Sequence, residues 1–234
     1  MTSTVLHQPK KIGILGGTFD PPHLGHLKLA TYFAKCFALD ELLLIPNGAP
    51  WQKEVSITPA EIRYQLTEAA AIDLARAFLY AQIPTLISLD RIEIERLGPS
   101  YAIDTAKALR ARFGAETSLI WLMGADSFIA LPTWSSWQDL LDYVNLAVAS
   151  RPHHHLQEEL STELQAFLAL HPCNDATTLT KSPFGRIYLD ESLAVDLSSS
   201  ALRKQLQAGS QALTGSGQIP SHALELITKL GLYK

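Results

Sequence analysis

Cysteine is scarce in this chain, with two among 234 residues, Cys36 and Cys173. The two lie far apart in the sequence and belong to no C-x-x-C pair. They are most simply free thiols, which are typical of a reducing compartment. We therefore expect a cytoplasmic protein.

Positive charge is also in short supply. The 19 lysines and arginines are outnumbered by 23 aspartates and glutamates, which leaves a formal net charge of −4. Binding to duplex nucleic acid without regard to sequence relies on a basic face, so we expect no nucleic-acid partner. An anionic ligand would have to be captured by a local site rather than by the overall field of the protein.

Long apolar runs are absent as well. No uninterrupted apolar stretch approaches the roughly 20 residues that a membrane-spanning helix needs, so no membrane partner is expected. Residues 1–10 are polar and mixed in character, which excludes a signal peptide and predicts a flexible tail. There is no internal repeat, and the sequence leaves the oligomeric state, including a homo-oligomer, open.

The chain does have the material for a sizeable core, being 47% hydrophobic and 18% charged. Short apolar runs alternate with segments of helical periodicity, which predicts an α/β fold with a doubly wound parallel sheet. We expect a single domain over residues 11–234, in which 184–234 form a small helical C-terminal subdomain. The expected strands cover residues 11–15, 41–45, 87–95, 118–123, 145–149 and 185–189.

Capping residues predict where the helices begin. Thr58 and Glu61 predict a capping box that opens a helix through about residue 78. Ser100 is expected to cap a helix that ends near Gly114. The other expected segments are a helix directly after residue 26, one amphipathic helix over 156–170, a loop over 171–185 and a final helix capped by Pro220 and Ser221.

The chain is organised around the stretch GGTFDPPHLGH, residues 16–26. It connects the first expected strand to a helix, and Gly16 and Gly17 allow a tight bend and a close backbone approach to a ligand. The N-terminus of the following helix favours an anion. His23 and His26 share one face of its first turn, and Gly25 leaves room between them. The stretch therefore predicts a polyphosphate site.

This spacing differs from the G-x-G-x-x-G fingerprint of dinucleotide-binding Rossmann folds, and it lacks the G-K-[ST] of a P-loop. It resembles the GGTFDPxHxGH signature of the nucleotidyltransferases with an H-x-G-H motif, relatives of class I aminoacyl-tRNA synthetases. The resemblance implies the Rossmann-like nucleotidyltransferase fold and an ATP site. Its ATP-binding residues would be Gly16, Gly17, Thr18, Phe19, His23, Gly25 and His26.

A second motif lies near the other end of the chain. Three hydroxyls, a helix N-terminus and an arginine one turn further on form a second anion cradle. The segment resembles the ISSTxxR motif of the same family, with Leu197 in place of the isoleucine and a serine in place of the threonine. The residues that it would add to the ATP site are Ser198, Ser199, Ser200 and Arg203.

Other segments resemble the bacterial nicotinate-mononucleotide adenylyltransferases. Residues 46–53 follow an expected strand and resemble an IPN-x-x-P segment, in which Asn47 would contact the mononucleotide and Lys53 a phosphate. Residues 124–127 follow another strand, and ligands of open α/β sheets bind at such ends. Trp134 offers a flat face to a pyridine ring, although simple packing explains it equally well. The expected mononucleotide-binding residues are Asp20, Asn47, Lys53, Ala102, Thr105, Gly124, Asp126, Trp134 and Ser135.

The resemblance implies that the 5′-phosphate of nicotinate mononucleotide attacks the α-phosphorus of ATP, giving deamido-NAD and pyrophosphate in NAD biosynthesis. A phosphate oxygen is already ionised at neutral pH, so neither a general base nor a covalent intermediate is required. The expected catalytic residues are His23, His26 and Arg203, which would neutralise charge on the triphosphate.

Magnesium is the expected cofactor, bound with ATP and held largely by phosphate oxygens and water. Asp126 would bind either the ribose or the hydrated metal, and the sequence does not decide between them. The run His153, His154 and His155 is expected to be a solvated loop, because adjacent residues point in different directions and zinc needs convergent ligands. We therefore expect no protein metal site.

Ala102 departs from the family, which often has a threonine at this position that touches the nicotinate carboxylate. Selectivity for the acid would then depend on backbone N–H groups near Trp134 and Ser135, with Thr105 one helical turn away. A dual-specificity or nicotinamide-mononucleotide enzyme therefore stays open. Further alternatives are another H-x-G-H enzyme, such as a phosphopantetheine adenylyltransferase, and a nucleotide-binding regulator that has lost catalysis.

Overall fold

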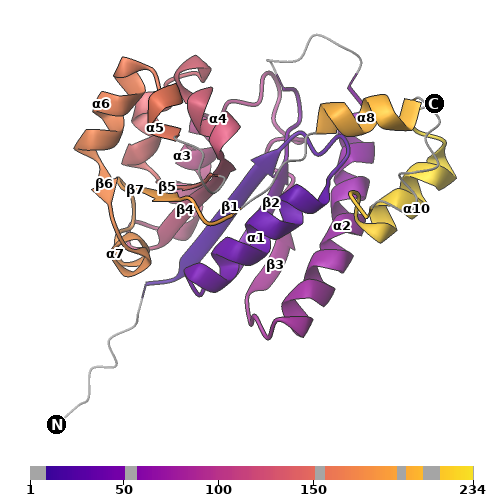
Figure 1. Cartoon of the computed structure of the whole chain (residues 1–234), viewed down its shortest axis with the longest axis horizontal. Coiled ribbons are helices and arrows are strands. Elements are labelled where there is room, and N and C mark those ends of the chain that lie inside the picture. The colour runs from indigo at the N-terminus through magenta and orange to yellow at the C-terminus, as the bar shows by residue number, and fades with distance from the viewer. Residues whose placement is uncertain (1–8, 51–56, 151–155, 194–198, 208–216, 234) are drawn as a thin grey trace.

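The structure is a computed structural model that describes residues 9–50, 57–150, 156–193, 199–207 and 217–233. Its centre is a seven-stranded sheet in the order β3-β2-β1-β4-β5-β7-β6, in which every neighbouring pair is parallel. The expected doubly wound parallel sheet is confirmed (Figure 1). The strands are β1 (Lys11–Gly17), β2 (Glu41–Pro46), β3 (Leu86–Leu89), β4 (Ser118–Gly124), β5 (Asn145–Ala149), β6 (Pro172–Cys173) and β7 (Ile187–Asp190).

Helices cover both faces of the sheet, because side chains along each buried strand point alternately to the two sides. On β1, Ile12 and Ile14 face one core, and Leu15 faces the other. The α-helices are α1 (Leu24–Cys36), α2 (Ala60–Tyr80), α3 (Ala102–Phe113), α4 (Ala125–Ile129), α5 (Leu156–Glu159), α6 (Thr162–Leu170), α7 (Ala176–Lys181), α8 (Ser199–Gln207) and α10 (Ser221–Leu230). Two 3₁₀-helices, η1 (Leu131–Thr133) and η2 (Trp137–Asp142), lie between α4 and β5.

The two cores use different helices. One includes buried residues of α3, η2 and α6, such as Leu109, Trp137 and Phe167. The other includes residues of α1 and α2, such as Phe33 and Leu74. The strand order changes direction at β1 and β4, and ligands of doubly wound sheets bind at the carboxyl ends of the strands around such a point.

The C-terminal helices α8 and α10 lie beside α2 (Figure 1). Leu202 of α8 and Ile227 of α10 are buried against Leu66 of α2. Asp73 of α2 accepts hydrogen bonds from the Ser221 hydroxyl, at 2.8 Å, and from the backbone N–H of His222, at 3.0 Å. Of the two residues expected to cap α10, Pro220 is the N-cap, and the Ser221 hydroxyl donates to Asp73 instead of capping the helix.

Two other capping predictions are wrong. The N-cap of α2 is Pro59, without a side-chain cap, because the Glu61 carboxylate pairs with Arg91 rather than with the backbone at Thr58. The N-cap of α3 is Tyr101, because the Ser100 hydroxyl accepts hydrogen bonds from another loop. Both side chains therefore serve tertiary contacts in place of local ones.

Three boundaries also differ from expectation. The strand predicted over 87–95 ends at Leu89, since Asp90 accepts a hydrogen bond from the Ile92 N–H, at 2.9 Å, and turns the chain. The helix predicted over 156–170 is broken, because Ser161 caps a new helix by accepting from the Leu164 N–H. The loop predicted over 171–185 contains β6 and α7.

No helix of the described residues is long and apolar enough to cross a membrane. Both cysteines are free thiols, Cys36 partly exposed and Cys173 buried. Most of the tail expected at residues 1–10 lies outside the described residues.

Candidate functional site

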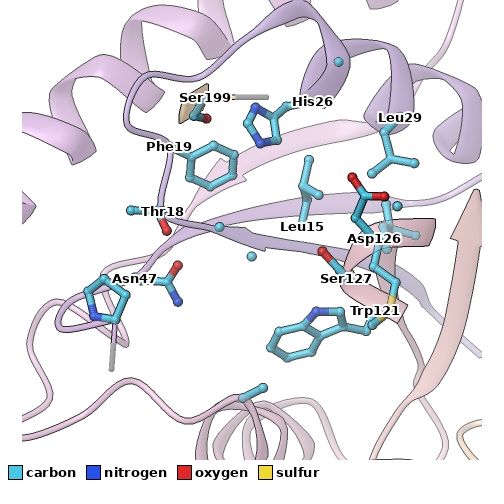
Figure 2. A pocket seen from close by; sticks show the side chains of 18 of the residues that line it. Leu15, Thr18, Phe19, His26, Leu29, Asn47, Trp121, Asp126, Ser127 and Ser199 are labelled. Carbon is cyan, nitrogen blue, oxygen red and sulfur yellow. The ribbon is translucent and has the colours of Figure 1, made fainter. Parts of the chain in front are cut away.

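A cavity of about 450 Å³ lies at the carboxyl ends of β1, β4 and β5. It is the place at which a doubly wound sheet binds ligands. Most of the residues singled out in the sequence meet there, although they come from segments far apart in the chain (Figure 2). The predicted residues that line it are Gly16, Gly17, Thr18, Phe19, His23, Gly25, His26, Asn47, Ala102, Gly124, Asp126, Trp134, Ser135 and Ser199.

The turn into α1 is made differently from the prediction. Gly16 and Gly17 do not bend the chain, because they are the last residues of β1 and pair with β2. A Cβ at Gly16 would lie 3.2 Å from the Trp121 ring, which explains the small residue there. The turn itself uses Phe19, with a φ of 47°, and a cis peptide bond between Asp20 and Pro21.

His23 and His26 stand together at the start of α1. Their rings are stacked, with centroids 3.7 Å apart and planes at 23°. The backbone N–H of His23 donates to Nδ1 of His26, at 3.1 Å, so a neutral His26 ring carries its proton on Nε2. Figure 2 shows the His26 ring beside that of Phe19, and the two centroids are 4.9 Å apart. The arrangement holds one imidazole donor in a fixed orientation.

His23 is buried, with 6% of its surface exposed. Desolvation lowers the pKa of its ring from 6.5 to about 4, so His23 is neutral at physiological pH. Its Nδ1 is buried and has no hydrogen-bond partner among the described residues. An unpartnered polar atom in the wall of a cavity is costly, which suits a place where a ligand binds.

The C-terminal region is tied to this turn. The Leu24 N–H, the first of α1, donates to the Gln218 carbonyl at 2.9 Å, so only part of this helix end faces a ligand. The Ser199 hydroxyl donates to the Pro21 carbonyl, also at 2.9 Å. Ser199 lines the cavity, and its oxygen remains able to accept a hydrogen bond.

Asp20 and Arg203 lie behind the cavity wall rather than in it. Asp20 is 1% exposed, and its carboxylate accepts hydrogen bonds from the Tyr233 hydroxyl and the Thr58 N–H. Nη1 of Arg203 donates to the Asp20 carbonyl and lies 3.7 Å from its Oδ2. Asp20, which is expected to contact the mononucleotide, is not among the residues that line the cavity, and its carboxylate anchors the C-terminal segment to the turn.

Asn47 follows β2 and meets a buried carboxylate that the sequence did not single out. Its Nδ2 donates to Oε2 of Glu93 at 2.9 Å, and the Thr105 hydroxyl donates to Oε1 of Glu93 at 2.8 Å. Burial raises the pKa of the Glu93 carboxyl, and these hydrogen bonds and the charge of Arg96 act in the opposite direction. Thr105, which is expected to contact the mononucleotide, is fully buried and is not among the residues that line the cavity.

The loop after Asn47 is clamped by its backbone. The N–H groups of Gly48 and Ala49 both donate to the Ser100 hydroxyl oxygen, at 3.0 and 3.1 Å. A Cβ at Gly48 would lie 2.0 Å from the Glu93 carbonyl oxygen, so only glycine fits. The buried Arg63 donates to the carbonyls of Thr18 and Gly48, and thereby joins this loop to the β1 turn.

The side of the cavity opposite His26 is formed by β4, α4 and the segment after η1. In Figure 2 Trp121 lies across the cavity from His26, and Ser127 and Asp126 follow along the side between Trp121 and Leu29. Trp121 was not singled out in the sequence, although it lies in a central strand, and Ser127, now in α4, belongs to the expected segment 124–127 without having been named as a ligand contact. Ser150, directly after β5, also lines the cavity, and its buried hydroxyl has no partner among the described residues.

Several predicted residues cannot be placed. Lys53 and Ser198 lie outside the described residues, as do His153–His155, and the same holds for the side chain of Ser200. Within the described parts of the chain, no three His, Cys, Asp or Glu side chains converge on a point that could hold a metal ion.

Comparison with known proteins gives one consistent result. The cytidylyltransferase-like family model matches residues 14–205. The chain is 38% identical over 223 residues to a probable nicotinate-nucleotide adenylyltransferase of Aeromonas salmonicida, covering 95% of this chain and 97% of that protein. It is 34% identical over 228 residues to a protein of the same description from Herminiimonas arsenicoxydans, covering 95% and 96%.

A solved structure shares the fold. Plasmodium falciparum nicotinic acid mononucleotide adenylyltransferase complexed with NaAD superposes with a TM-score of 0.64 at 18% sequence identity. The match covers 96% of this chain and 97% of that one.

Proposed function

The chain belongs to the cytidylyltransferase-like family and, within it, to the nicotinate-nucleotide adenylyltransferases, and from this membership we propose how it works. It joins ATP and nicotinate mononucleotide to give deamido-NAD and pyrophosphate, a step of NAD biosynthesis. The observation that carries the proposal is one cavity lined by two chemically different sets of residues. His26 and the other residues of the first motif suit a polyphosphate, and Asn47 and Trp134 suit a nucleotide with a flat ring.

The reaction needs positioning and charge neutralisation more than a protein nucleophile. The attacking phosphate oxygen is already ionised, so its alignment with the α-phosphorus removes most of the entropic barrier. Nε2–H of His26 donates to the phosphates of ATP, where negative charge builds as pyrophosphate leaves. His23 stacks behind it and keeps its ring in place.

The second motif acts together with the residues of the first. Ser199 offers its hydroxyl oxygen or, by releasing Pro21, its proton to the nucleotide. Arg203 adds positive charge beside the turn that carries the two histidines, from its place on Asp20. Ser198, Ser200 and the backbone of residues 16–19 complete the proposed ATP site.

The mononucleotide contacts the other set of residues. Trp134 stacks on the pyridine ring, and Asn47 and Asp126 hold the ribose and phosphate side of the molecule. Lys53 contributes its charge to the phosphate. Ala102 is the first residue of α3, so the nicotinate carboxylate meets backbone N–H groups of a helix N-terminus there and near Ser135.

Magnesium fits the site as an ion carried by ATP. The described residues offer no cage of three ligands, and Mg²⁺ commonly keeps its waters and binds substrate phosphates with one or two carboxylates. Asp126 is an exposed carboxylate in the wall of the cavity and could join such a sphere, whereas Glu93, which also lines the cavity, is buried. When bound, the ion neutralises charge on the triphosphate. The free thiols accord with the cytoplasmic setting that we propose.

The proposal is tested by comparing acceptors. Pyrophosphate release from Mg·ATP is measured side by side with nicotinate mononucleotide, nicotinamide mononucleotide and phosphopantetheine. We expect fast release with the acid and at least tenfold slower release with the amide, which turns an N–H toward N–H donors. Equal rates with acid and amide would make this a dual-specificity enzyme. Release with phosphopantetheine alone would overturn the assignment.

A further inference from the structure

Glu93 is a buried carboxylate that no step of the proposed reaction uses. We propose that it is a positioning residue that sets the orientation of the Asn47 amide, so that Oδ1 of Asn47 accepts a hydrogen bond from a ribose hydroxyl of the mononucleotide. The inference rests on the proposed function and deepens it. It is based on a series of hydrogen bonds in which the donor of each bond can be identified.

The series of hydrogen bonds begins at an arginine. Nη1 of Arg96 donates to the Thr105 hydroxyl oxygen at 3.1 Å, and that hydroxyl donates its single proton to Oε1 of Glu93 at 2.8 Å. An arginine only donates and a carboxylate only accepts. Burial raises the pKa of Glu93, and the hydrogen bonds from Thr105 and Asn47 together with the charge of Arg96 act to keep it a carboxylate, the form for which these directions hold. The remaining oxygen of Glu93, Oε2, can be satisfied only by a donor, which is Nδ2 of Asn47 at 2.9 Å.

The orientation of an asparagine amide is often ambiguous, because its oxygen and nitrogen look alike. Here an acceptor-only partner removes the ambiguity and places Nδ2 at Glu93. Figure 2 shows the result at the cavity: the amide oxygen of Asn47 is turned toward Thr18 and the nitrogen away from it. An oxygen acceptor suits a ribose hydroxyl and repels a phosphate or a carboxylate, which are themselves acceptors.

The burial of the Glu93 carboxylate lowers the stability of the fold, which argues against a purely structural role. Only 2% of its surface is exposed, and within the described residues it forms no ion pair. A buried carboxylate pays a desolvation cost that an uncharged side chain of the same shape avoids. A glutamine would fill the same space, but its amide nitrogen would present Asn47 with a donor in place of an acceptor.

The backbone of the Asn47 loop is held by N–H and carbonyl contacts that do not involve the Glu93 carboxylate directly, and the Ser100 hydroxyl that accepts two of them is also hydrogen-bonded to Glu93. Ser100 accepts the N–H groups of Gly48 and Ala49, and Arg63 donates to the Gly48 carbonyl. Loss of the carboxylate should therefore change the direction of one amide and leave the loop in place. This separation makes the inference testable.

The first variant is Glu93→Gln. Thr105 still donates to the amide oxygen at this position, so the amide nitrogen faces Asn47, which must turn its own oxygen away from the cavity. We expect the KM for nicotinate mononucleotide to rise about tenfold, the size of one lost hydrogen bond, with kcat and the KM for ATP within about twofold of the wild type. The control is Glu95→Gln, an exposed neighbour that pairs with Arg91.

The second pair of variants reverses the polarity of the contact. Asn47→Asp alone sets two carboxylates against each other and should raise this KM more than Glu93→Gln does. Combining both substitutions lets the glutamine amide donate to the aspartate, whose other oxygen faces the cavity as an acceptor. We expect the double variant to recover most of the loss of Asn47→Asp, which a merely structural role would not produce.

Initial rates of pyrophosphate release and quenching of tryptophan fluorescence by the mononucleotide provide the two readouts, and thermal unfolding checks each fold. An unchanged mononucleotide KM in Glu93→Gln, or a double variant no better than Asn47→Asp, would overturn the inference and leave the proposed function intact. If the wild-type protein releases no pyrophosphate with nicotinate mononucleotide, the proposed function itself is wrong. Fluorescence titration with the mononucleotide would then test the Asn47 contact by itself.

Discussion

The imidazole rings of His23 and His26 are stacked 3.7 Å apart, and the backbone N–H of the first holds Nδ1 of the second. Nε2 of His26 is thereby the donor offered to the cavity. Replacing His26 with alanine should lower turnover about 10²–10³-fold, as removal of a preorganised donor does in other enzymes. The measurement is kcat from pyrophosphate release, with thermal unfolding as the check on the fold.

His171→Ala is the matched control for that experiment, because His171 lies outside the cavity and bonds to the Gly185 carbonyl. It should leave turnover within about twofold of the wild type. Turnover in His26→Ala equal to that of the wild type would remove His26 from the mechanism.

The low pKa of His23 has a consequence for stability. The ring titrates near its ordinary value of 6.5 when unfolded and near 4 when folded, so the unfolded chain binds more protons between these values. Stability therefore falls as pH drops from about 6.5 to 4, by up to about 3 kcal/mol from this group. Denaturant titrations of the wild type and His23→Gln at pH 7.5 and 4.5 measure it. A pH-dependent loss of the same size in both proteins would contradict the burial of a neutral His23.

The parallel sheet could be predicted from the sequence because its central strands are continuous apolar runs between helical segments. Several of the wrong predictions concern helix caps, where a polar side chain can bond either to its own helix or to a segment distant in the sequence. Ser100 was expected to cap α3, but its oxygen receives two N–H groups from the loop after β2. The spacing of residues in the sequence indicates only local hydrogen bonds, so this tertiary contact could not be predicted.

Tyr233 lies near the end of the chain and donates to the buried carboxylate of Asp20. Burial and that carboxylate raise the pKa of its hydroxyl above the ordinary value, so it stays protonated as a donor. Tyr233→Phe leaves the carboxylate short of one partner and should cost about 1–3 kcal/mol of stability. Thermal unfolding should show a lower Tm, whereas Tyr80→Phe, at a residue that is 93% exposed, should not. Equal Tm values for both variants would show that the C-terminal segment does not anchor the turn.

Gly48 has no room for a side chain. A Cβ there would meet the Glu93 carbonyl oxygen at 2.0 Å, so Gly48→Ala must push the Asn47 loop outward. We expect a loss of about 1–3 kcal/mol of stability and a rise in the KM for the mononucleotide, with the KM for ATP nearly unchanged. Gly124→Ala is the stability control, since a Cβ there meets nothing within 4 Å. A KM that rises equally for both substrates would place this loop elsewhere in the mechanism.

In the candidate site too, the residues that a motif identifies could be predicted from the sequence, and those that depend on tertiary contacts could not. His26, Asn47 and Trp134, which the sequence singles out as ligand contacts, all line one cavity. Glu93 was missed because apolar and charged residues alternate along its segment, which predicts a strand with the glutamate on the exposed face. The chain turns at Asp90 instead, and Glu93 is buried. The position of Thr105 in the sequence could not show whether its hydroxyl contacts a ligand or the buried carboxylate of Glu93.

The most direct test of the account is the stoichiometry of the reaction of the wild-type protein with Mg·ATP and nicotinate mononucleotide. Direct attack of one bound substrate on the other predicts one deamido-NAD for each pyrophosphate, and no pyrophosphate when the mononucleotide is left out. Pyrophosphate released without the mononucleotide, or in excess over the dinucleotide, would contradict the account.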